Sequence, residues 1–252
     1  MTDWSVIFCG TRKSGLARGM RAKRSVGGHF AGLPRFRVEV IVPRAAKARS
    51  AQQAARREEI LKAALGVFAE HGFEAARLDD VAQRAGVAKG TLYLYFTDKT
   101  ALFEEIVRTA ASPLIERLSA MSEAPDVPAP LVLSAFLELF RTEVLGTDRK
   151  LILRLIMTEG PRFPHIAAFY HREVVSRGLA FMRKVIARGI ARGELRPSAL
   201  EQFPQLVMAP ALLALLWDGL FQKLDPIDIA GLFKAHLALI TAPTHPVSQK
   251  EP

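Results

Sequence analysis

The sequence of 252 residues contains a single cysteine, Cys9, and it has neither a Cys/His cluster nor a long apolar run. One cysteine excludes an internal disulfide framework and a thiolate metal site, so we expect a reducing compartment, the cytoplasm. The longest charge-free stretch, 202–217, has 16 residues and includes Pro204 and Pro210, whereas a membrane span needs about 20 apolar residues. The first residues also lack the apolar core of a signal peptide, so we expect neither secretion nor membrane insertion.

Groups that would indicate catalysis are missing as well. The chain has no recognisable nucleophile, base and orienting residue, no phosphate-binding glycine loop and no pair of catalytic carboxylates. His165 and His171 are six residues apart and do not share a helix face, which argues against a metal site. We therefore expect a protein that is not an enzyme and uses no metal or cofactor.

Positive charge is distributed unevenly along the chain. The 35 Lys and Arg residues exceed the 25 Asp and Glu residues by ten, but residues 1–50 alone carry 11 basic and two acidic side chains. The remaining residues have a net charge of only +1. We interpret 1–50 as a basic, mostly disordered extension, although 35–42 alternates enough for a short strand. The extension is an arm that binds phosphate, a solvated tail, or the product of a start assigned too early, with Met20 or a later residue as the true start.

Helical patterning begins after this extension. Apolar residues recur at three- and four-residue spacing up to Gly72, which predicts an amphipathic helix that ends there. A short helix at 78–85 is followed by Gly86, which can adopt the left-handed conformation of a sharp turn, and a third helix spans 89–96. Two helices joined by a tight glycine turn form the helix-turn-helix pattern.

The outward face of the third helix suits contact with DNA. With Leu92 and Phe96 directed inward, the outward face carries no acidic side chain, and no Asp or Glu occurs in 81–97. Its residues allow close backbone approach, hydrogen bonds to phosphate and apolar contact with thymine methyl groups. The alternative is that the tyrosines merely cover a small core. The outward and flanking residues are Lys89, Gly90, Thr91, Tyr93, Leu94 and Tyr95.

A specific motif extends from this helix into the next. The residues 90–99 read Gly-Thr-Leu-Tyr-x-Tyr-Phe-x-x-Lys, and Leu102-Phe103 follows. With these residues, the stretch 57–107 resembles the DNA-binding domain of TetR-family transcriptional regulators. The resemblance implies that the outward residues of the third helix face DNA and that Lys99 binds a backbone phosphate at a helix N-terminus.

Two positions depart from the family pattern. Arg77 stands where members usually have Thr or Ser at the cap of the second helix, and Ala88 stands where many have Ser. Loss of a capping hydroxyl costs about 1 kcal/mol, and we expect Arg77 to reach a phosphate directly. Residues 51–97 carry six basic and six acidic side chains, so binding would depend on the local face and on the basic extension.

The rest of the chain predicts a body of helices only. Three boundaries have capping signals: Asp98 as an N-cap, Ser198 with Glu201 as a capping box, and Asp225 before a first-turn proline. The predicted helices are 98–121, 131–144, 149–158, 166–191, 198–223 and 226–241.

The last two of these helices are apolar on most sides, and such helices need partners on most sides. Resemblance to the family implies a partner, because its members pair through their last two long helices as homodimers. The alternative is a deep core within one chain. The residues assigned to dimerisation are Leu212, Leu216, Leu220, Phe233 and Leu237.

One irregular segment, 158–165, interrupts the body and is a candidate wall of a small-molecule pocket. Glu159 and Arg162 would be its polar anchors, among Phe163, Phe169 and Tyr170. The alternative is an interhelical corner fixed by prolines and a local ion pair.

These features together predict an all-α protein with four parts: the extension 1–50, a three-helix helix-turn-helix DNA-binding domain at 51–97, a helical effector-binding and dimerisation domain at 98–242, and a disordered tail at 243–252. The resemblance implies a homodimeric repressor that binds a palindromic operator and is released by an unidentified small-molecule effector. The alternatives are a transcriptional activator, an enzyme with an appended helix-turn-helix, and a helical binding or scaffold module that keeps the fold without specific DNA binding.

Overall fold

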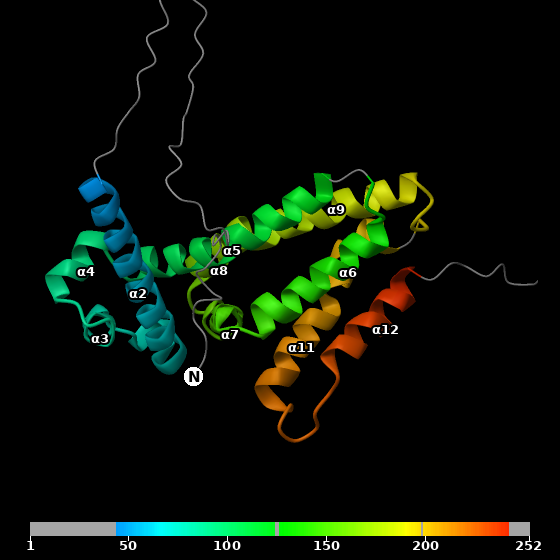
Figure 1. The fold of residues 1–252 in the computed structure, drawn as a ribbon. Coiled ribbons are helices and arrows are strands. Elements are labelled where there is room, and N and C mark those ends of the chain that lie inside the picture. Colours follow the sequence, from blue (N-terminus) through cyan, green and yellow to red (C-terminus); the bar gives the residue numbers. More distant parts are fainter. Residues whose placement is uncertain (1–43, 124–125, 198, 242–252) are drawn as a thin grey trace, which may run out of the picture.

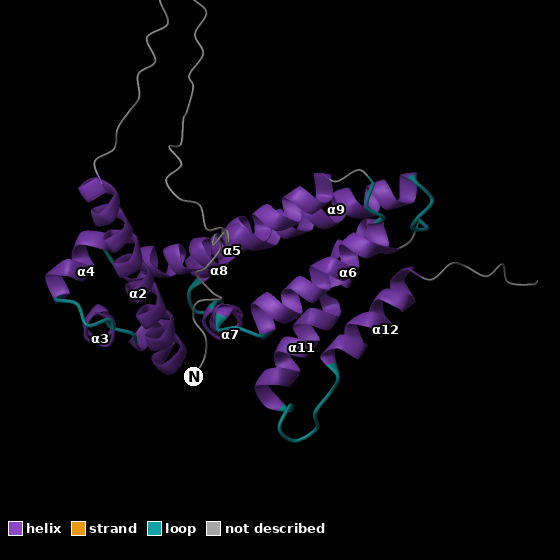
Figure 2. Ribbon diagram, in the orientation of Figure 1, coloured by secondary structure: helices purple, strands orange, loops and turns teal. Residues whose placement is uncertain are grey.

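The computed structural model describes residues 44–123, 126–197 and 199–241, and no strand occurs within them (Figures 1 and 2). Its elements are the α-helices α2 Arg44–Ala75, α3 Leu78–Arg84, α4 Lys89–Tyr95, α5 Lys99–Glu123, α6 Ala129–Leu139, α7 Arg149–Glu159, α8 Pro164–Tyr170, α9 Ser176–Ala191, α10 Ala199–Gln202, α11 Ala209–Leu220 and α12 Ile229–Thr241, the π-helical turns η1 Phe140–Leu145 and η2 His171–Val175, and the 3-10 turn η3 Pro204–Met208. The predicted all-α fold is confirmed. None of the described helices combines the length and hydropathy that crossing a membrane requires.

The helix-turn-helix is formed by α3 and α4, packed against α2. Gly86 has a φ of 63°, the left-handed conformation predicted for the turn, and Leu92 and Phe96 are buried as predicted. The backbone of α2 departs from helical geometry at Gly72, whose φ is 76°. These three predictions from local sequence are confirmed because each rests on a short-range rule, either glycine's freedom at positive φ or the helical period.

Helix α2 begins at Arg44, so the last seven residues of 1–50 are helical. The remainder of that segment, including the strand considered at 35–42, lies outside the described residues, as do Ser198 and the tail 243–252. Asp98 caps α5 as predicted, since its carboxylate Oδ1 accepts a hydrogen bond from the backbone N–H of Ala101 at 2.8 Å.

The predicted helix 198–223 is wrong, because the chain divides there into α10, η3 and α11. Pro204 and Pro210 each stand at the start of an element, where a missing N–H is tolerated, and a proline in a helix interior would remove a hydrogen bond. The last helix begins at Ile229, not at Pro226, and the N–H of Leu232 donates to the carbonyl of Asp228 at 2.9 Å.

Buried residues form two clusters. The first joins α2, α3, α4 and the first half of α5 to α7 and α8. It includes Phe68, Phe73 and Phe103, whose ring centroids lie 5.6–6.3 Å apart. The second joins the distal half of α5 to α6, α9, α11 and α12. We call the first the DNA-proximal core, after the DNA contact expected of α4, and the second the distal core.

Helices α2, α3 and α4 lie at one end of the molecule (Figure 1). The paired helices α5 and α9 extend from there toward the other end, and α11 and α12 lie as an antiparallel pair next to α6, below α5 and α9 in this view. Helix α7 lies between the two ends and packs against α2. Helices α5 and α7 therefore both connect the helix-turn-helix to the body.

Candidate DNA interface and effector cavity

The outer face of α4 is exposed at the positions that the sequence assigned to DNA. Leu94 is 85% exposed and Tyr93 is 47% exposed, whereas Leu92 is buried. A Cβ added at Gly90 would meet no atom within 4 Å, so the backbone there is open to close approach. Thr91 and Tyr95 are partly buried at the flanks. An exposed leucine and tyrosine on a helix held from behind by the DNA-proximal core form a surface suited to a groove.

Lys89 opens α4 and forms an ion pair with Asp79 of α3, with Nζ 2.7 Å from Oδ1. The hydrogen bond that Lys89 donates to the carboxylate of Asp79 is the main reason that the pKa of Lys89 is raised. Both side chains are more than half exposed, so the pair adds little to stability. Lys89 therefore stays charged and can exchange this carboxylate for a phosphate.

Arg77 occupies the N-cap of α3 in an extended conformation and makes no capping hydrogen bond with its side chain. It is exposed, which is compatible with the predicted phosphate contact. The side chain of Lys99 is held by two contacts with the end of α2. Its Nζ donates a hydrogen bond to the carbonyl of Glu74 at 2.6 Å, and it lies 5.1 Å from the ring centroid of Phe73. Lys99 thus links the start of α5 to the end of α2.

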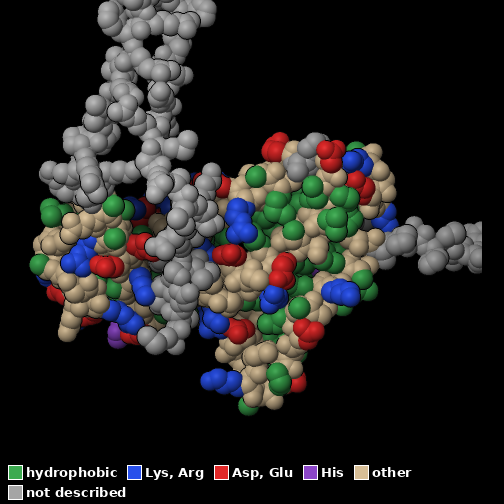
Figure 3. Space-filling view, in the orientation of Figure 1, with side chains coloured by type: hydrophobic (Ala, Val, Ile, Leu, Met, Phe, Trp, Pro, Cys, Tyr) green, Lys and Arg blue, Asp and Glu red, His purple; other side chains and the backbone are tan. Residues whose placement is uncertain are grey.

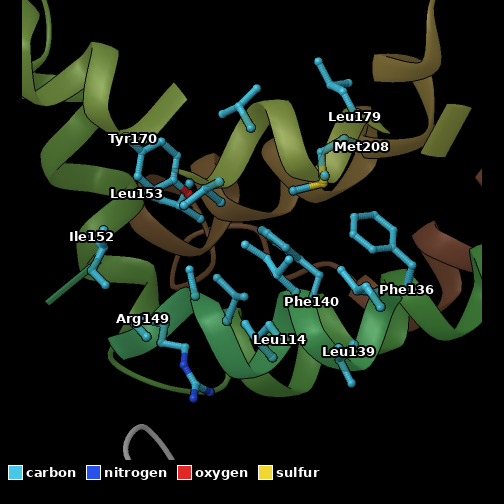
Figure 4. Close-up of a pocket in the computed structure, with 18 of the residues that line it drawn as sticks. Leu114, Phe136, Leu139, Phe140, Arg149, Ile152, Leu153, Tyr170, Leu179 and Met208 are labelled. Carbon is cyan, nitrogen blue, oxygen red and sulfur yellow. The ribbon is translucent and has the colours of Figure 1, made fainter. Parts of the chain in front are cut away.

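A cavity of about 290 Å³ occupies the body. Its wall is almost entirely apolar, with side chains from α5, α6, α7, α9 and the turns between them directed toward one space (Figure 4). The lining residues are Val107, Ala110, Ala111, Leu114, Ile115, Leu118, Phe136, Leu139, Phe140, Val144, Arg149, Ile152, Leu153, Tyr170, Val174, Val175, Gly178, Leu179, Met182, Gln205, Met208 and Leu212.

The cavity lies where the two cores meet. Val107 and Ile152 belong to the DNA-proximal core, and Phe136 and Met182 belong to the distal core. Both helices that connect the ends of the molecule, α5 and α7, contribute to its wall. A molecule bound there would therefore contact both cores at once.

Four of the five residues assigned to a ligand pocket do not line this cavity. Arg162 forms an exposed ion pair with Glu74, and Phe163 packs on Phe73 with ring centroids 5.2 Å apart. Glu159 lies beside Gly72, its Oε1 2.9 Å from the position that a Cβ would take there. Segment 158–165 thus packs against the end of α2, and we call this contact the junction.

Phe169 is also outside the cavity wall. It is buried in the DNA-proximal core, between the guanidinium groups of Arg108 at 4.8 Å and Arg172 at 5.2 Å from its ring centroid. Tyr170, the next residue, does line the cavity. Burial raises the pKa of its hydroxyl further above neutral pH.

An apolar stripe runs along the outside of α11. Leu212, Leu216 and Leu220 follow one another at four-residue spacing and are 40–61% exposed. Of the two α12 residues assigned to dimerisation, Phe233 is 4% exposed and Leu237 is partly buried against the distal core. The assignment of Phe233 is therefore corrected: it packs within its own chain because α12 turns that face toward α6.

Charged side chains of both signs are interspersed on the face shown in Figure 3, and no continuous basic surface covers the described residues in that view. Near the helix-turn-helix, several cations are paired: Arg84 lies 2.7 Å from Glu70 and Arg57 lies 2.5 Å from Glu105. The bond from Arg84 is the main cause that lowers the pKa of Glu70. The basic character of the chain therefore resides mainly in residues 1–50.

The sequence missed the cavity because its wall is assembled from nine elements, each of which contributes a few apolar residues that resemble ordinary core. Two residues in the sequence do indicate this region. Gly178 stands in the first turn of the amphipathic helix α9, directly after η2, and Pro113 lies inside the long helix α5 beside the cavity-lining residue Leu114. Each residue is unfavourable in a helix interior, so each marks a place with an additional constraint.

Comparison with known protein families gives two matches. The model described as "Bacterial regulatory proteins, tetR family" matches residues 60–106, and the model described as "Tetracyclin repressor-like, C-terminal domain" matches residues 132–232. The regulator YhgD of Bacillus subtilis, an uncharacterised HTH-type transcriptional regulator, is 28% identical over 188 residues, which are 72% of this chain and 94% of YhgD. The repressor KstR2 of Mycolicibacterium smegmatis is 26% identical over 147 residues, 58% of this chain and 70% of KstR2.

Solved structures have the same fold. The transcriptional regulator FadR from Bacillus subtilis, in complex with stearoyl-CoA, superposes with a TM-score of 0.63 at 22% identity and covers 74% of this chain and 98% of its own. The fatty acid degradation regulator FadR from Bacillus halodurans superposes with a TM-score of 0.60 at 20% identity, over 74% of this chain and 94% of its own.

Proposed function

Because the chain belongs to the TetR family of bacterial regulatory proteins, we propose that it is a homodimeric transcriptional repressor that leaves a palindromic operator when a small-molecule effector binds. The proposal rests on the two faces of α4: Leu92 and Phe96 are buried on the inner face, and Tyr93 and Leu94 are exposed on the outer face. This helix enters the major groove, and residues 51–97 act as the DNA-binding domain. As a regulator that binds DNA, the protein works in the cytoplasm.

Contacts to DNA are divided between positioning and sequence recognition. Lys89, Arg77 and Lys99 contact phosphates and fix the position of the domain on the duplex. Tyr93 and Leu94 contact base edges, and Gly90 allows the backbone to approach. Thr91 and Tyr95, at the flanks of the same face, donate hydrogen bonds from their hydroxyl groups to phosphate or base.

Pairing of two chains places two copies of α4 on one face of the DNA. The stripe Leu212, Leu216 and Leu220, together with Leu237 of α12, forms a two-fold interface in which each patch contacts its own copy. Two-fold symmetry in the protein matches a palindrome in the operator, with half-sites about one helical turn apart or slightly more.

The effector acts by filling the cavity between the two cores, within the domain 98–242. Because α5 and α7 both line this cavity and both contact the helix-turn-helix end, a ligand there favours dimers in which the two α4 helices no longer match adjacent major grooves. The FadR complex with stearoyl-CoA supports a ligand site in this fold, since a regulator of this fold binds a molecule with a long apolar chain.

The test is selection of bound sequences from random DNA with the purified full-length protein. We expect enrichment of one inverted repeat, bound much more tightly than bulk DNA and with steep loss of affinity as salt rises. Enrichment of no sequence would overturn the proposal in favour of a helical binding module, and a direct repeat would overturn the two-fold dimer.

A further inference from the structure

The wall of the cavity has few polar side chains. Of its 22 residues, only Arg149, Tyr170 and Gln205 carry a polar side chain. The volume of about 290 Å³ is roughly twice that of a cavity of about 150 Å³ that holds benzene. The space is therefore large enough for a small organic molecule and offers it few polar partners.

The single cation in the wall is already compensated. Nη1 of Arg149 donates to Glu143 Oε2 at 2.8 Å and to the carbonyl of Glu143 at 3.1 Å. In Figure 4 the guanidinium group of Arg149 points away from the other labelled side chains of the wall. Arg149 thus presents its aliphatic part to the cavity and keeps its charge paired with a carboxylate outside it, so it does not supply a counter-ion to an anionic ligand.

Tyr170 is the remaining ionisable residue in the wall. Its hydroxyl is neutral at neutral pH, as in any tyrosine, and burial raises its pKa further. A neutral hydroxyl can donate or accept one hydrogen bond and cannot balance a charge. An ionised ligand group placed inside this wall would lose its hydration and gain no opposite charge, which is strongly unfavourable.

Gly178 keeps part of the space open. It lies in the first turn and a half of α9, and a Cβ added there would meet no atom within 4 Å. Glycine lowers the stability of a helix, and Gly178 faces the cavity. Its presence indicates that a side chain at this position would fill volume that a bound ligand needs.

Both π-helical turns in the described residues border the same cavity. Phe140 and Val144 of η1 and Val174 and Val175 of η2 all belong to its wall. π-Helical turns are rare and occur frequently at functional sites, because they redirect side chains at a cost in helix geometry. Their position indicates that the cavity is a ligand site and not a packing defect.

We propose that the cavity binds an uncharged, lipophilic molecule: a hydrocarbon skeleton, aromatic or aliphatic, with at most one hydrogen-bonding group, which contacts the hydroxyl of Tyr170. Any ionised group of the ligand stays outside, beyond the exposed residue Gln205. The assignment names the chemical class of the effector and rests on the proposed function for its regulatory meaning.

The test uses two fluorescent probes that differ by one charged group. N-phenyl-1-naphthylamine is neutral, and 8-anilino-1-naphthalenesulfonate has the same skeleton with an added sulfonate. We expect the neutral probe to bind the full-length protein saturably, one per chain, and the anionic probe to displace it only at concentrations at least about tenfold higher. Equal competition by the anionic probe, or no saturable binding of the neutral one, would overturn the assignment.

Two variants at one position locate the bound probe. Gly178→Leu places a side chain in the cavity and should weaken binding of the neutral probe at least about tenfold. Gly178→Ala is the matched control, since it improves the helix and adds a single methyl group, and it should retain affinity within about threefold. Unchanged affinity in Gly178→Leu, with circular dichroism showing a folded protein, would place the probe elsewhere and overturn the proposal. Because these measurements contain no DNA, their failure would leave the operator selection unaffected.

Discussion

At the scale of single residues, Tyr93 and Tyr170 illustrate two uses of the same side chain. Tyr93 presents its ring and hydroxyl on the open face of α4, where both can be covered by a partner. Tyr170 faces a cavity, where burial raises the pKa of the hydroxyl. The role of Tyr93 is therefore tested by the affinity for operator DNA, and that of Tyr170 by the dependence of stability on pH.

Replacement of Tyr93 by alanine should weaken binding to the selected operator by at least about tenfold, because a contact that recognises a base is worth about 1–3 kcal/mol. Gel-shift titration measures the change. Leu131→Ala is the control, since Leu131 is 61% exposed on α6, away from the helix-turn-helix. Equal loss of affinity in the two variants would show that Tyr93 has no particular role.

Tyr170 should make stability fall at alkaline pH. The hydroxyl ionises near pH 10 in the unfolded chain and only at higher pH in the folded protein. Its contribution is therefore complete below about pH 10 and is lost as the pH rises above that value, at about 1.4 kcal/mol per pH unit. Urea unfolding between pH 9 and 11 should show a steeper decline for the native protein than for Tyr170→Phe, and parallel curves would contradict this expectation.

At the scale of elements, the junction is the contact through which α7 reaches the helix-turn-helix. Gly72, at a φ of 76°, leaves room for Glu159, while Phe163 covers Phe73. The sequence identified segment 158–165 as irregular, and its alternative interpretation as a corner with an ion pair describes the observed geometry better than a pocket. The partner of Arg162 is Glu74, 88 residues away, and local patterns do not reveal such pairs.

A pair of glycine variants tests the junction. Gly72 and Gly193 both have positive φ, so alanine at either position should cost about 1–2 kcal/mol of unfolding free energy. Only at Gly72 would the new Cβ lie against another element, 2.9 Å from Glu159 Oε1, whereas at Gly193 it meets nothing. We expect both variants to lose stability in chemical denaturation, and only Gly72→Ala to change operator affinity. Equal operator affinities would exclude a role for this contact in DNA binding.

Local rules explain how far the sequence predicted the elements. The turn at Gly86, the cap at Asp98 and the inward Leu92 depend on neighbours within four residues, and all three are observed. The continuous helix 198–223 was wrong because apolar periodicity outweighed two prolines in the prediction. The cavity depends on volumes left between elements distant in sequence, which residue types alone do not encode.

At the scale of the whole molecule, we expect the stripe on α11 to mediate dimerisation and the basic extension to add to the affinity for DNA. Leu216→Glu should produce monomers in sedimentation velocity and abolish tight operator binding, because an unpaired carboxylate would be buried at the two-fold interface. Leu131→Glu is the control on an exposed leucine outside the stripe. A dimeric Leu216→Glu protein would show that α11 is not the interface.

Removal of residues 1–43 should leave α2 intact, since that helix begins at Arg44. If the extension contacts phosphates, the shortened protein should lose affinity, and the slope of log affinity against log salt should fall. The selected sequence should stay the same, because recognition lies in α4. A changed sequence preference would show that the extension recognises bases.

The DNA-proximal core crosses the expected boundary between residues 97 and 98, since Phe103, Ile152 and Phe169 pack in it with residues of α2 and α4. The DNA-reading part of this protein is therefore not a detachable module. A chimera that fuses residues 51–97 to another regulator's body would leave apolar surfaces of α2 without partners, whereas exchange of α4's outer face alone would keep them covered. To direct such a regulator to a new operator, substitution of the exposed residues of α4 is therefore better suited than exchange of the whole segment 51–97.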